Sequence, residues 1–182
     1  MGALKARALR LIAFALALGA GQALAQSQQA SEPTIKAAFL YKFAGYVEWP
    51  ATALPAPETA VTIAIAGNNE VAEELDRLVP GRKVNGRPVL VRRLRAGEDP
   101  RGAHLVFVGR GEPNPGVLAR AAQQAGALVV AESERGLEQG AAINFVPMED
   151  RIGFDVSLEA AEKAGVRISS RMLGVARKVV SR

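Results

Sequence analysis

The sequence predicts an α/β fold: a single compact domain with a mixed, mostly parallel sheet flanked by helices and a C-terminal β-hairpin, preceded by a cleaved signal peptide. Two observations predict the domain. Apolar runs and helical segments follow one another as strand–helix–strand–strand–helix–strand, which is typical of a largely parallel sheet. Closer to the C-terminus, two apolar runs flank the four turn-prone residues 147–150, which indicates a hairpin.

The first residues carry the three parts of a secretory signal peptide. These parts are the basic residues Lys5, Arg7 and Arg10, the apolar run 11–20, and the small-residue site Ala23-Leu24-Ala25. The apolar run is roughly 10 residues long, whereas a membrane-spanning helix needs about 20. We therefore expect cleavage between Ala25 and Gln26, a mature protein in the periplasm, and no transmembrane segment in the mature chain.

The composition gives no support for nucleic-acid binding and excludes disulfide bonds. Three of the 23 Lys and Arg residues lie in the expected signal peptide, which has no acidic residue. The mature chain therefore has 20 basic and 18 acidic residues. The high pI is thus partly a property of the leader, and it does not argue for nucleic-acid binding. The chain has no cysteine, so the fold must be stabilised by packing without disulfides.

The mature chain divides into a lead-in and one domain. Residues 26–33 are polar and rich in Gln and Ser, so we expect them to be disordered before a domain at 34–182. A helix is expected over 34–49, ended by Pro50. This helix is apolar on nearly all sides, so either the rest of the domain or a second chain must cover it.

The remaining elements follow from apolar runs, caps and turn residues. We expect the following elements in chain order: strand 61–66, helix 70–78 capped by Asn69, strands 88–94 and 104–108, helix 115–124 and strand 127–131. The run 104–108 (HLVFV) is nearly all apolar, which favours a central strand. The C-terminal part is expected to hold hairpin strands 141–146 and 151–156, helix 158–163 capped by Ser157, and a last helix capped by Ser169 or Ser170 with Leu173, Ala176 and Val180 on one stripe.

Two stretches resemble a known family. They are AAFLYKFAGYVEWP at 37–50 and the stretch GAAINFVPMEDRIGFDVSLEAAEKAGVRISSRMLGVA at 140–176. Together they are similar to the YfiR family of exported proteins, whose opening helix reads FLY-x-F-x-x-YVEWP and whose C-terminal part carries G-x-x-I-x-F-V and ISS-x-L-L-x-A motifs. The resemblance covers most of 34–180.

The resemblance implies a periplasmic, non-enzymatic repressor. The best-studied family members bind the periplasmic portion of an inner-membrane diguanylate cyclase and hold it inactive, so the resemblance implies lower cyclic di-GMP and less biofilm formation. The resemblance also implies a compact α/β domain that forms a homodimer. Relatives commonly have cysteine where this chain has Ala103, so redox control of the cysteine-bearing members is not expected here.

Six residues are candidates for partner or ligand contact: Tyr41, Tyr46, Trp49, His104, Asn144 and Arg151. Trp49 and the aromatic residues before it could form an interface hot spot, but such a stripe is usually part of a core, with Trp49 filling a gap beside Tyr46. His104, the only histidine, is either a hydrogen-bonded structural residue or a ligand contact. Arg151 suits recognition of a carboxylate or phosphate, with a salt bridge to Glu149, Asp150 or Asp155 as the alternative.

The sequence offers no set of residues for catalysis, a cofactor or a metal site. One histidine and no cysteine leave few metal ligands, and no G-x-S-x-G motif presents a nucleophile. Gly109-x-Gly111 is half of a dinucleotide fingerprint, but two prolines follow it, so a plain turn is the better interpretation. The alternative to cyclase control is an envelope module for a small ligand or cell-wall fragment, with a polar pocket that involves His104, Asn144 and Arg151. A hydrolase is a third hypothesis.

Charge is distributed unevenly along the chain. Basic residues gather at 82–101, and acidic residues gather at 132–150. Ordinary solvated faces explain both clusters. A basic patch for an anionic partner, such as an acidic protein surface, is the other interpretation of the first cluster.

Overall fold

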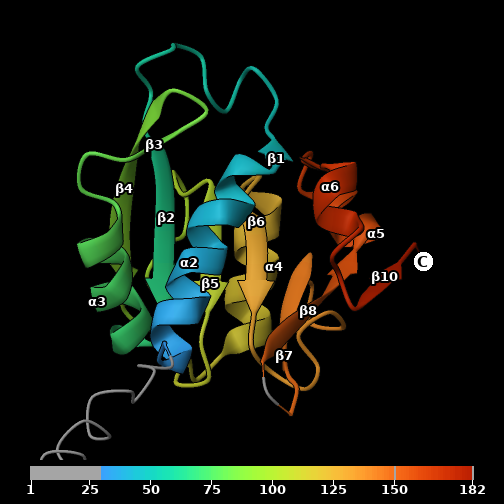
Figure 1. The fold of residues 1–182 in the computed structure, drawn as a ribbon. Helices are drawn as coiled ribbons and strands as arrows, with labels where there is room; N and C mark the ends of the chain where they lie inside the picture. The colour runs from blue at the N-terminus through green and yellow to red at the C-terminus, as the bar shows by residue number, and fades with distance from the viewer. Residues whose placement is uncertain (1–29, 150, 182) are drawn as a thin grey trace, which may run out of the picture. The chain divides into compact units, whose positions relative to one another are not determined.

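The computed structural model describes residues 30–149 and 151–181 (Figure 1). The predicted signal peptide and its cleavage site at Ala25 and Gln26 lie outside these residues. The helices are α2 (Glu32–Gly45), α3 (Asn69–Leu78), α4 (Pro115–Gln124), α5 (Leu158–Lys163) and α6 (Ser170–Leu173). The strands are β1 (Val47–Glu48), β2 (Val61–Ala66), β3 (Lys83–Val84), β4 (Arg87–Leu94), β5 (Leu105–Val108), β6 (Leu128–Ala131), β7 (Ile143–Pro147), β8 (Ile152–Ser157), β9 (Arg167–Ile168) and β10 (Lys178–Val180).

Within the described residues, eight strands form one sheet in the order β10-β8-β7-β6-β5-β2-β4-β3. Strands β4, β2, β5, β6 and β7 are parallel to their neighbours in this run, and β8 returns antiparallel to β7 as the expected hairpin. All four residues of β5 are buried, which agrees with its apolar sequence and its central place. The predicted fold class, a mixed and mostly parallel α/β sheet flanked by helices, is confirmed.

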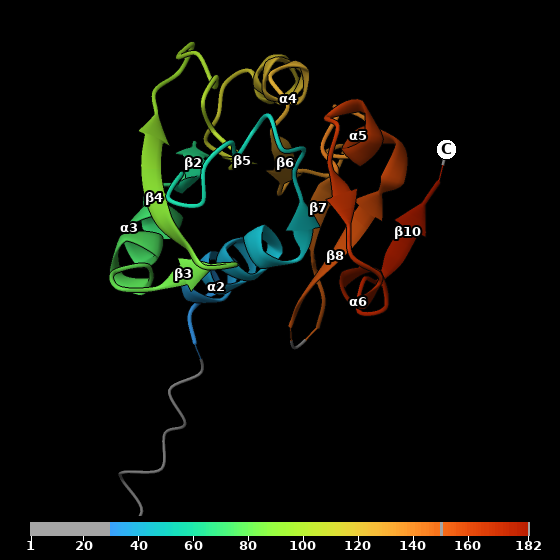
Figure 2. The same cartoon turned by 90° about the horizontal axis from the view of Figure 1, so that it is seen from above.

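Two apolar layers lie on opposite faces of the sheet. Figure 2 shows α2 and α4 on opposite sides of it. Alternate residues of β2 and β5, such as Ile63 and Phe107, pack with α2 and α3 in the larger cluster, whereas Ala64 and Val106 pack with α4 in the smaller one. This alternation is what a strand covered on both faces requires.

The first helix begins and ends earlier in the chain than the sequence predicts. Helix α2 begins at Glu32, where the Ser31 side chain accepts a hydrogen bond from Thr34 N–H, so Glu32 and Pro33 of the expected lead-in are helical. It ends at Gly45 rather than at Trp49. The prediction over 46–49 is wrong because Val47 and Glu48 form β1, which pairs antiparallel with β9.

The domain itself covers much of this helix. Leu40 and Phe43 are buried, and the ring of Phe43 lies 4.9 Å from that of Phe154 and 5.8 Å from that of Phe145, measured between centroids. Phe39 contacts the same rings. Phe43 is therefore a core residue, and partly buried Phe39 packs beside it; both rings lie against the hairpin β7–β8.

Three further details differ from the sequence-based expectation. Asn68 caps α3, with Oδ1 accepting from Val71 N–H at 3.1 Å, and Asn69 is the first helical residue. Helix α6 ends at Leu173, so Ala176 and Val180 do not extend it. Val180 instead lies in β10, which pairs parallel with β8.

Candidate functional site

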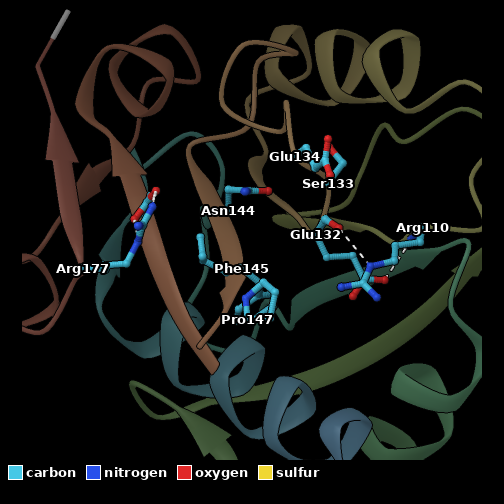
Figure 3. Close-up of a pocket in the computed structure, with 10 residues that line it drawn as sticks. Arg110, Glu132, Ser133, Glu134, Asn144, Phe145, Pro147 and Arg177 are labelled. Carbon is cyan, nitrogen blue, oxygen red and sulfur yellow. Dashed lines mark hydrogen bonds and ion pairs between the residues drawn. The ribbon is translucent and has the colours of Figure 1, made fainter. Parts of the chain in front are cut away.

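An open cleft of about 550 Å³ lies at the carboxyl edge of the central strands (Figure 3). It is lined by Arg110, Glu132, Ser133, Glu134, Asn144, Phe145, Val146, Pro147, Asp155 and Arg177. Arg110 comes after β5, residues 132–134 follow β6, residues 144–147 belong to β7, Asp155 lies on β8, and Arg177 precedes β10. The carboxyl ends of parallel strands are where ligands of α/β proteins commonly bind. We call this hollow the carboxyl-edge cleft.

Glu132 is a buried carboxylate that joins three segments. It forms an ion pair with Lys36 of α2, and both side chains are almost completely buried. Its Oε1 also accepts hydrogen bonds from Asn68 Nδ2 at 3.1 Å and from the Arg110 backbone N–H at 2.9 Å. A buried charge is tolerated only when it is paired and hydrogen-bonded, so this network fixes one wall of the carboxyl-edge cleft against α2.

Lys36 also pairs with Glu32, one turn earlier in α2. The hydrogen bond from Lys36 lowers the pKa of the Glu32 carboxyl below its usual value, and partial burial opposes this shift. The sequence placed Glu132 in a solvated acidic cluster, and that interpretation is wrong for this residue. The signal that could have found it is its position directly after a fully buried strand.

A second ion pair, between Arg177 and Asp155, lies on the opposite side of the cleft. Arg177 Nε donates to Asp155 Oδ1 at 2.8 Å, and a terminal nitrogen of the same guanidinium donates to the other carboxylate oxygen. The hydrogen bond with Asp155 raises the pKa of Arg177. Asp155 therefore pairs with Arg177, and the alternative of a salt bridge between Arg151 and Asp155 is not formed.

Asn144 lies between these two walls. It is opposite Asp155 in the β7–β8 ladder and opposite Ala131 in the β6–β7 ladder. The Asn144 side chain lines the cleft, yet its Oδ1 is buried and accepts no hydrogen bond from any described residue. A Cβ at Gly136 would lie 2.1 Å from this oxygen, so the loop after β6 packs directly against the amide. A buried polar atom without a partner is rare, and it calls for an explanation.

His104 and Trp49 lie elsewhere and hold a loop to the sheet. His104 Nδ1 accepts from Thr62 N–H at 3.0 Å, and Nε2 lies 3.0 Å from the Ala53 carbonyl, which suits a neutral ring with its proton on Nε2. Trp49 Nε1 donates to the His104 carbonyl at 3.3 Å. Since His104 precedes β5 and Asn144 aligns with the last residue of β5 through Ala131, the two lie at opposite ends of the strands.

The other predicted contact residues are separated as well. The Tyr41 hydroxyl donates to the Lys83 carbonyl at 2.9 Å, and the Arg82 guanidinium lies 5.9 Å from the Tyr41 ring centroid. Tyr46 is 41% exposed. Arg151 is exposed beside the hairpin turn, one residue before β8. The structure thus does not bring His104, Asn144 and Arg151 into one pocket; only Asn144 lines the carboxyl-edge cleft.

The glycine pair after β5 serves loop packing. Gly109 N–H donates to the Ala66 carbonyl at 2.8 Å, and Gly111 N–H donates to the Gly67 carbonyl at 2.9 Å. A Cβ on either Gly109 or Gly111 would lie 2.7 Å from the Gly67 oxygen. These glycines allow the loops after β2 and β5 to approach closely, as expected for a plain turn.

The basic cluster at 82–101 is largely engaged within the chain. Arg93 pairs with Asp76 at 2.6 Å, Arg92 with Glu98 at 3.3 Å, and Arg101 with Asp99. Arg87 donates to backbone carbonyls of the 54–59 loop. These contacts favour ordinary solvated faces over an open basic patch.

Comparison with known proteins gives a family and a fold. A family model described as YfiR/HmsC-like matches residues 33–177. No curated protein matches the chain. The crystal structure of a conserved domain protein from Vibrio cholerae is similar, with a TM-score of 0.53 and 12% sequence identity over 82% of this chain and 60% of that one.

No group of three or more His, Cys, Asp or Glu side chains in 30–149 and 151–181 could hold a metal ion. Within the same ranges, no helix has both the length and the apolar character needed to cross a bilayer.

Proposed function

This chain belongs to the YfiR/HmsC-like family, and we propose that it is a periplasmic, non-enzymatic regulator that binds the periplasmic portion of an inner-membrane diguanylate cyclase and represses it. The observation that carries the proposal is the family match, because it spans nearly the whole described domain. The sequence of the leader supports export. Lower cyclic di-GMP and less biofilm are the expected consequences.

Repression of this kind requires differential affinity. The regulator must bind the inactive conformation of the cyclase more tightly than the active one, since equal affinity for both would leave the equilibrium between the two conformations unchanged. A 100-fold preference corresponds to about 2.7 kcal/mol. A small interface with one or two well-placed charged or aromatic anchors can supply this difference.

The tip of the β7–β8 hairpin is the surface we propose for this contact. Met148 is 37% exposed there, and Arg151 is exposed with no ion-pair partner among the described residues. An unpaired guanidinium beside an exposed thioether can bind a carboxylate and an apolar side chain of a partner. Exposed Tyr46 is a second proposed contact, whereas Tyr41 and Trp49 are engaged within the domain. We further propose that the protein is a homodimer.

Deleting the gene is expected to raise cellular cyclic di-GMP, and Arg151→Glu is expected to do the same because it places a negative charge in the proposed contact. The measurement is cyclic di-GMP in extracts of cells that express the cyclases, with the level of each variant checked by immunoblot. Arg120→Glu on α4, on another surface, is the matched control and should leave repression intact. An unchanged cyclic di-GMP level after deletion would remove the proposal.

A further inference from the structure

We propose that a groove between α4 and the connection from β4 to β5 binds a small primary alkylamine, through its ammonium group and its apolar chain. The inference goes beyond the regulator proposal and does not depend on it, because the groove contains none of the residues proposed to contact a cyclase. It rests on a buried carboxylate that has no counter-charge and on the apolar side chains beside it.

The connection that forms one side of the groove has no helix. Strands β4 and β5 are both parallel to β2, which lies between them in the sheet. Such connections usually contain a helix, whereas residues 95–104 contain none. Figure 2 shows this segment on the same side of the sheet as α4. A groove of about 380 Å³ lies between the segment and α4, and we call it the crossover groove. Its lining includes Glu98, Asp99, Glu112, Asn114, Val117 and Leu118.

Glu112 is the buried carboxylate of the crossover groove. The residue is only 7% exposed, although glutamate is rarely buried unless it is paired. Its Oε1 accepts a hydrogen bond from the Asn114 backbone N–H at 3.1 Å. Among the described residues, Oε2 accepts no hydrogen bond and Glu112 forms no ion pair, yet Oε2 is not sealed from solvent. Because a carboxylate can accept about four hydrogen bonds, most of this capacity is unused.

Capping of α4 alone does not account for this burial. A carboxylate beside the first turn of a helix is stabilised by the free N–H groups there, and Oε1 already makes that contact. Glu70 has the more usual arrangement, since it lies in the first turn of α3 and is exposed. Burial of the Glu112 charge costs free energy that capping does not require. A cation bound in the groove would offset this cost.

The two other lining carboxylates are already paired. Arg92 pairs with Glu98 at 3.3 Å, and Arg101 Nε donates to Asp99 at 2.6 Å. The hydrogen bond from the Arg101 side chain lowers the pKa of the Asp99 carboxyl, as expected for an engaged group. The acidic character of the loop therefore does not carry the inference, and Glu112 is the lining carboxylate that a ligand cation can still neutralise.

The other lining residues select the rest of the ligand. Val117 is 62% exposed, and partly buried Leu118 lies beside it on α4, so the groove has an apolar wall. The Asn114 side chain makes no capping hydrogen bond, although Asn114 is the N-cap of α4, so its amide oxygen is a second available acceptor. The ligand ammonium can donate to Glu112 Oε2 and to this oxygen, while its alkyl chain packs on the apolar wall.

The single open oxygen of Glu112 favours an ammonium over a guanidinium. A guanidinium binds best when both carboxylate oxygens accept its two parallel N–H groups, but Oε1 is occupied by the Asn114 N–H. An ammonium is a compact charge that needs one oxygen from each acceptor. The groove volume of about 380 Å³ is near the lower end of small-molecule sites, which suits a small amine.

The test is a titration of the isotope-labelled mature protein, followed by the shifts of its backbone amide NMR signals. The three probes share one alkyl chain: hexylamine is a cation, hexanol is neutral and hexanoate is an anion. We expect hexylamine to shift the signals of Gly97, Glu112 and Val117 saturably. Hexanol and hexanoate should bind at least about tenfold more weakly, because neither supplies a charged donor to Glu112.

Variants assign the binding to the crossover groove. Glu112→Gln should weaken hexylamine binding by about tenfold or more, whereas Glu70→Gln, in the first turn of α3, should not. Val117→Lys places a positive charge in the groove and should weaken binding as well, while Val117→Leu keeps the apolar wall and should retain it. Val117 is exposed, so its variants test the inference even if Glu112→Gln fails to fold, which its amide spectrum would show.

Three results would each overturn the inference. They are the absence of a saturable shift with hexylamine, equal binding of hexylamine and hexanol, and hexylamine binding that is unchanged in both Val117→Lys and a folded Glu112→Gln. None of them would affect the cyclase proposal, because no cyclase is present in the experiment.

Discussion

Replacing Lys36 by methionine is expected to lower the free energy of unfolding by about 3–5 kcal/mol, because it leaves the Glu132 carboxylate buried without its counter-charge. Both side chains are almost completely buried, and methionine keeps the length of the lysine stem, so packing changes little. The hydrogen bonds from Asn68 and Arg110 remain, but they cannot supply the missing positive charge. Urea denaturation followed by circular dichroism measures the effect.

Lys163→Met is the matched control for this experiment. Lys163 forms an i,i+4 pair with Glu159 on α5, and its side chain is 61% exposed. Exposed pairs of this kind contribute about 0.3–0.5 kcal/mol, so the same substitution should have little effect there. The double variant Lys36→Met/Glu132→Gln should recover part of the lost stability, since it removes the uncompensated charge. Equal effects of Lys36→Met and Lys163→Met would show that the buried pair does not stabilise the fold as described.

The second large effect is expected at Phe43. Truncation to alanine should cost about 3–5 kcal/mol, because it removes a buried ring from the centre of the aromatic cluster and leaves a cavity. The Phe43 ring lies within 5.8 Å of the rings of Phe39, Phe145 and Phe154, measured between centroids, so the cavity would lie between α2 and the hairpin.

Leu90→Ala on β4 provides the comparison, since Leu90 is 56% exposed and should lose less than about 1 kcal/mol. Thermal and urea unfolding of both variants measure the difference. A small loss at Phe43, similar to that at Leu90, would mean that the aromatic cluster does not hold the first helix to the hairpin.

Much of the fold follows from local patterns in the sequence. Strands β2, β5 and β6 are short apolar runs that must be covered on both faces, and such runs are recognisable without knowledge of their partners. The hairpin follows from four turn-prone residues between two apolar runs. The strands that the sequence does not predict are β1, β3, β9 and β10, with two or three residues each. Their conformation depends on the strand they pair with, not on their own sequence.

The candidate site depends still more on distant contacts. Lys36 and Glu132 are 96 residues apart, and nothing near either residue indicates that they pair. In the sequence, Lys36 is a polar residue on an apolar helix and Glu132 belongs to an acidic cluster. Asn144 is the one predicted contact residue that lines the cleft. Arg110 and Arg177 come from a loop and from a segment before a short edge strand, so only the assembled sheet brings them together.

The central claim, that this domain acts by binding a cyclase, is tested most directly by an affinity measurement. The mature protein would be immobilised and titrated with the purified periplasmic portions of the membrane-bound diguanylate cyclases of the same cell. We predict saturable binding to at least one of them with a dissociation constant in the micromolar range or tighter, weakened by Arg151→Glu and unaffected by Arg120→Glu. Binding to none of them would contradict the account.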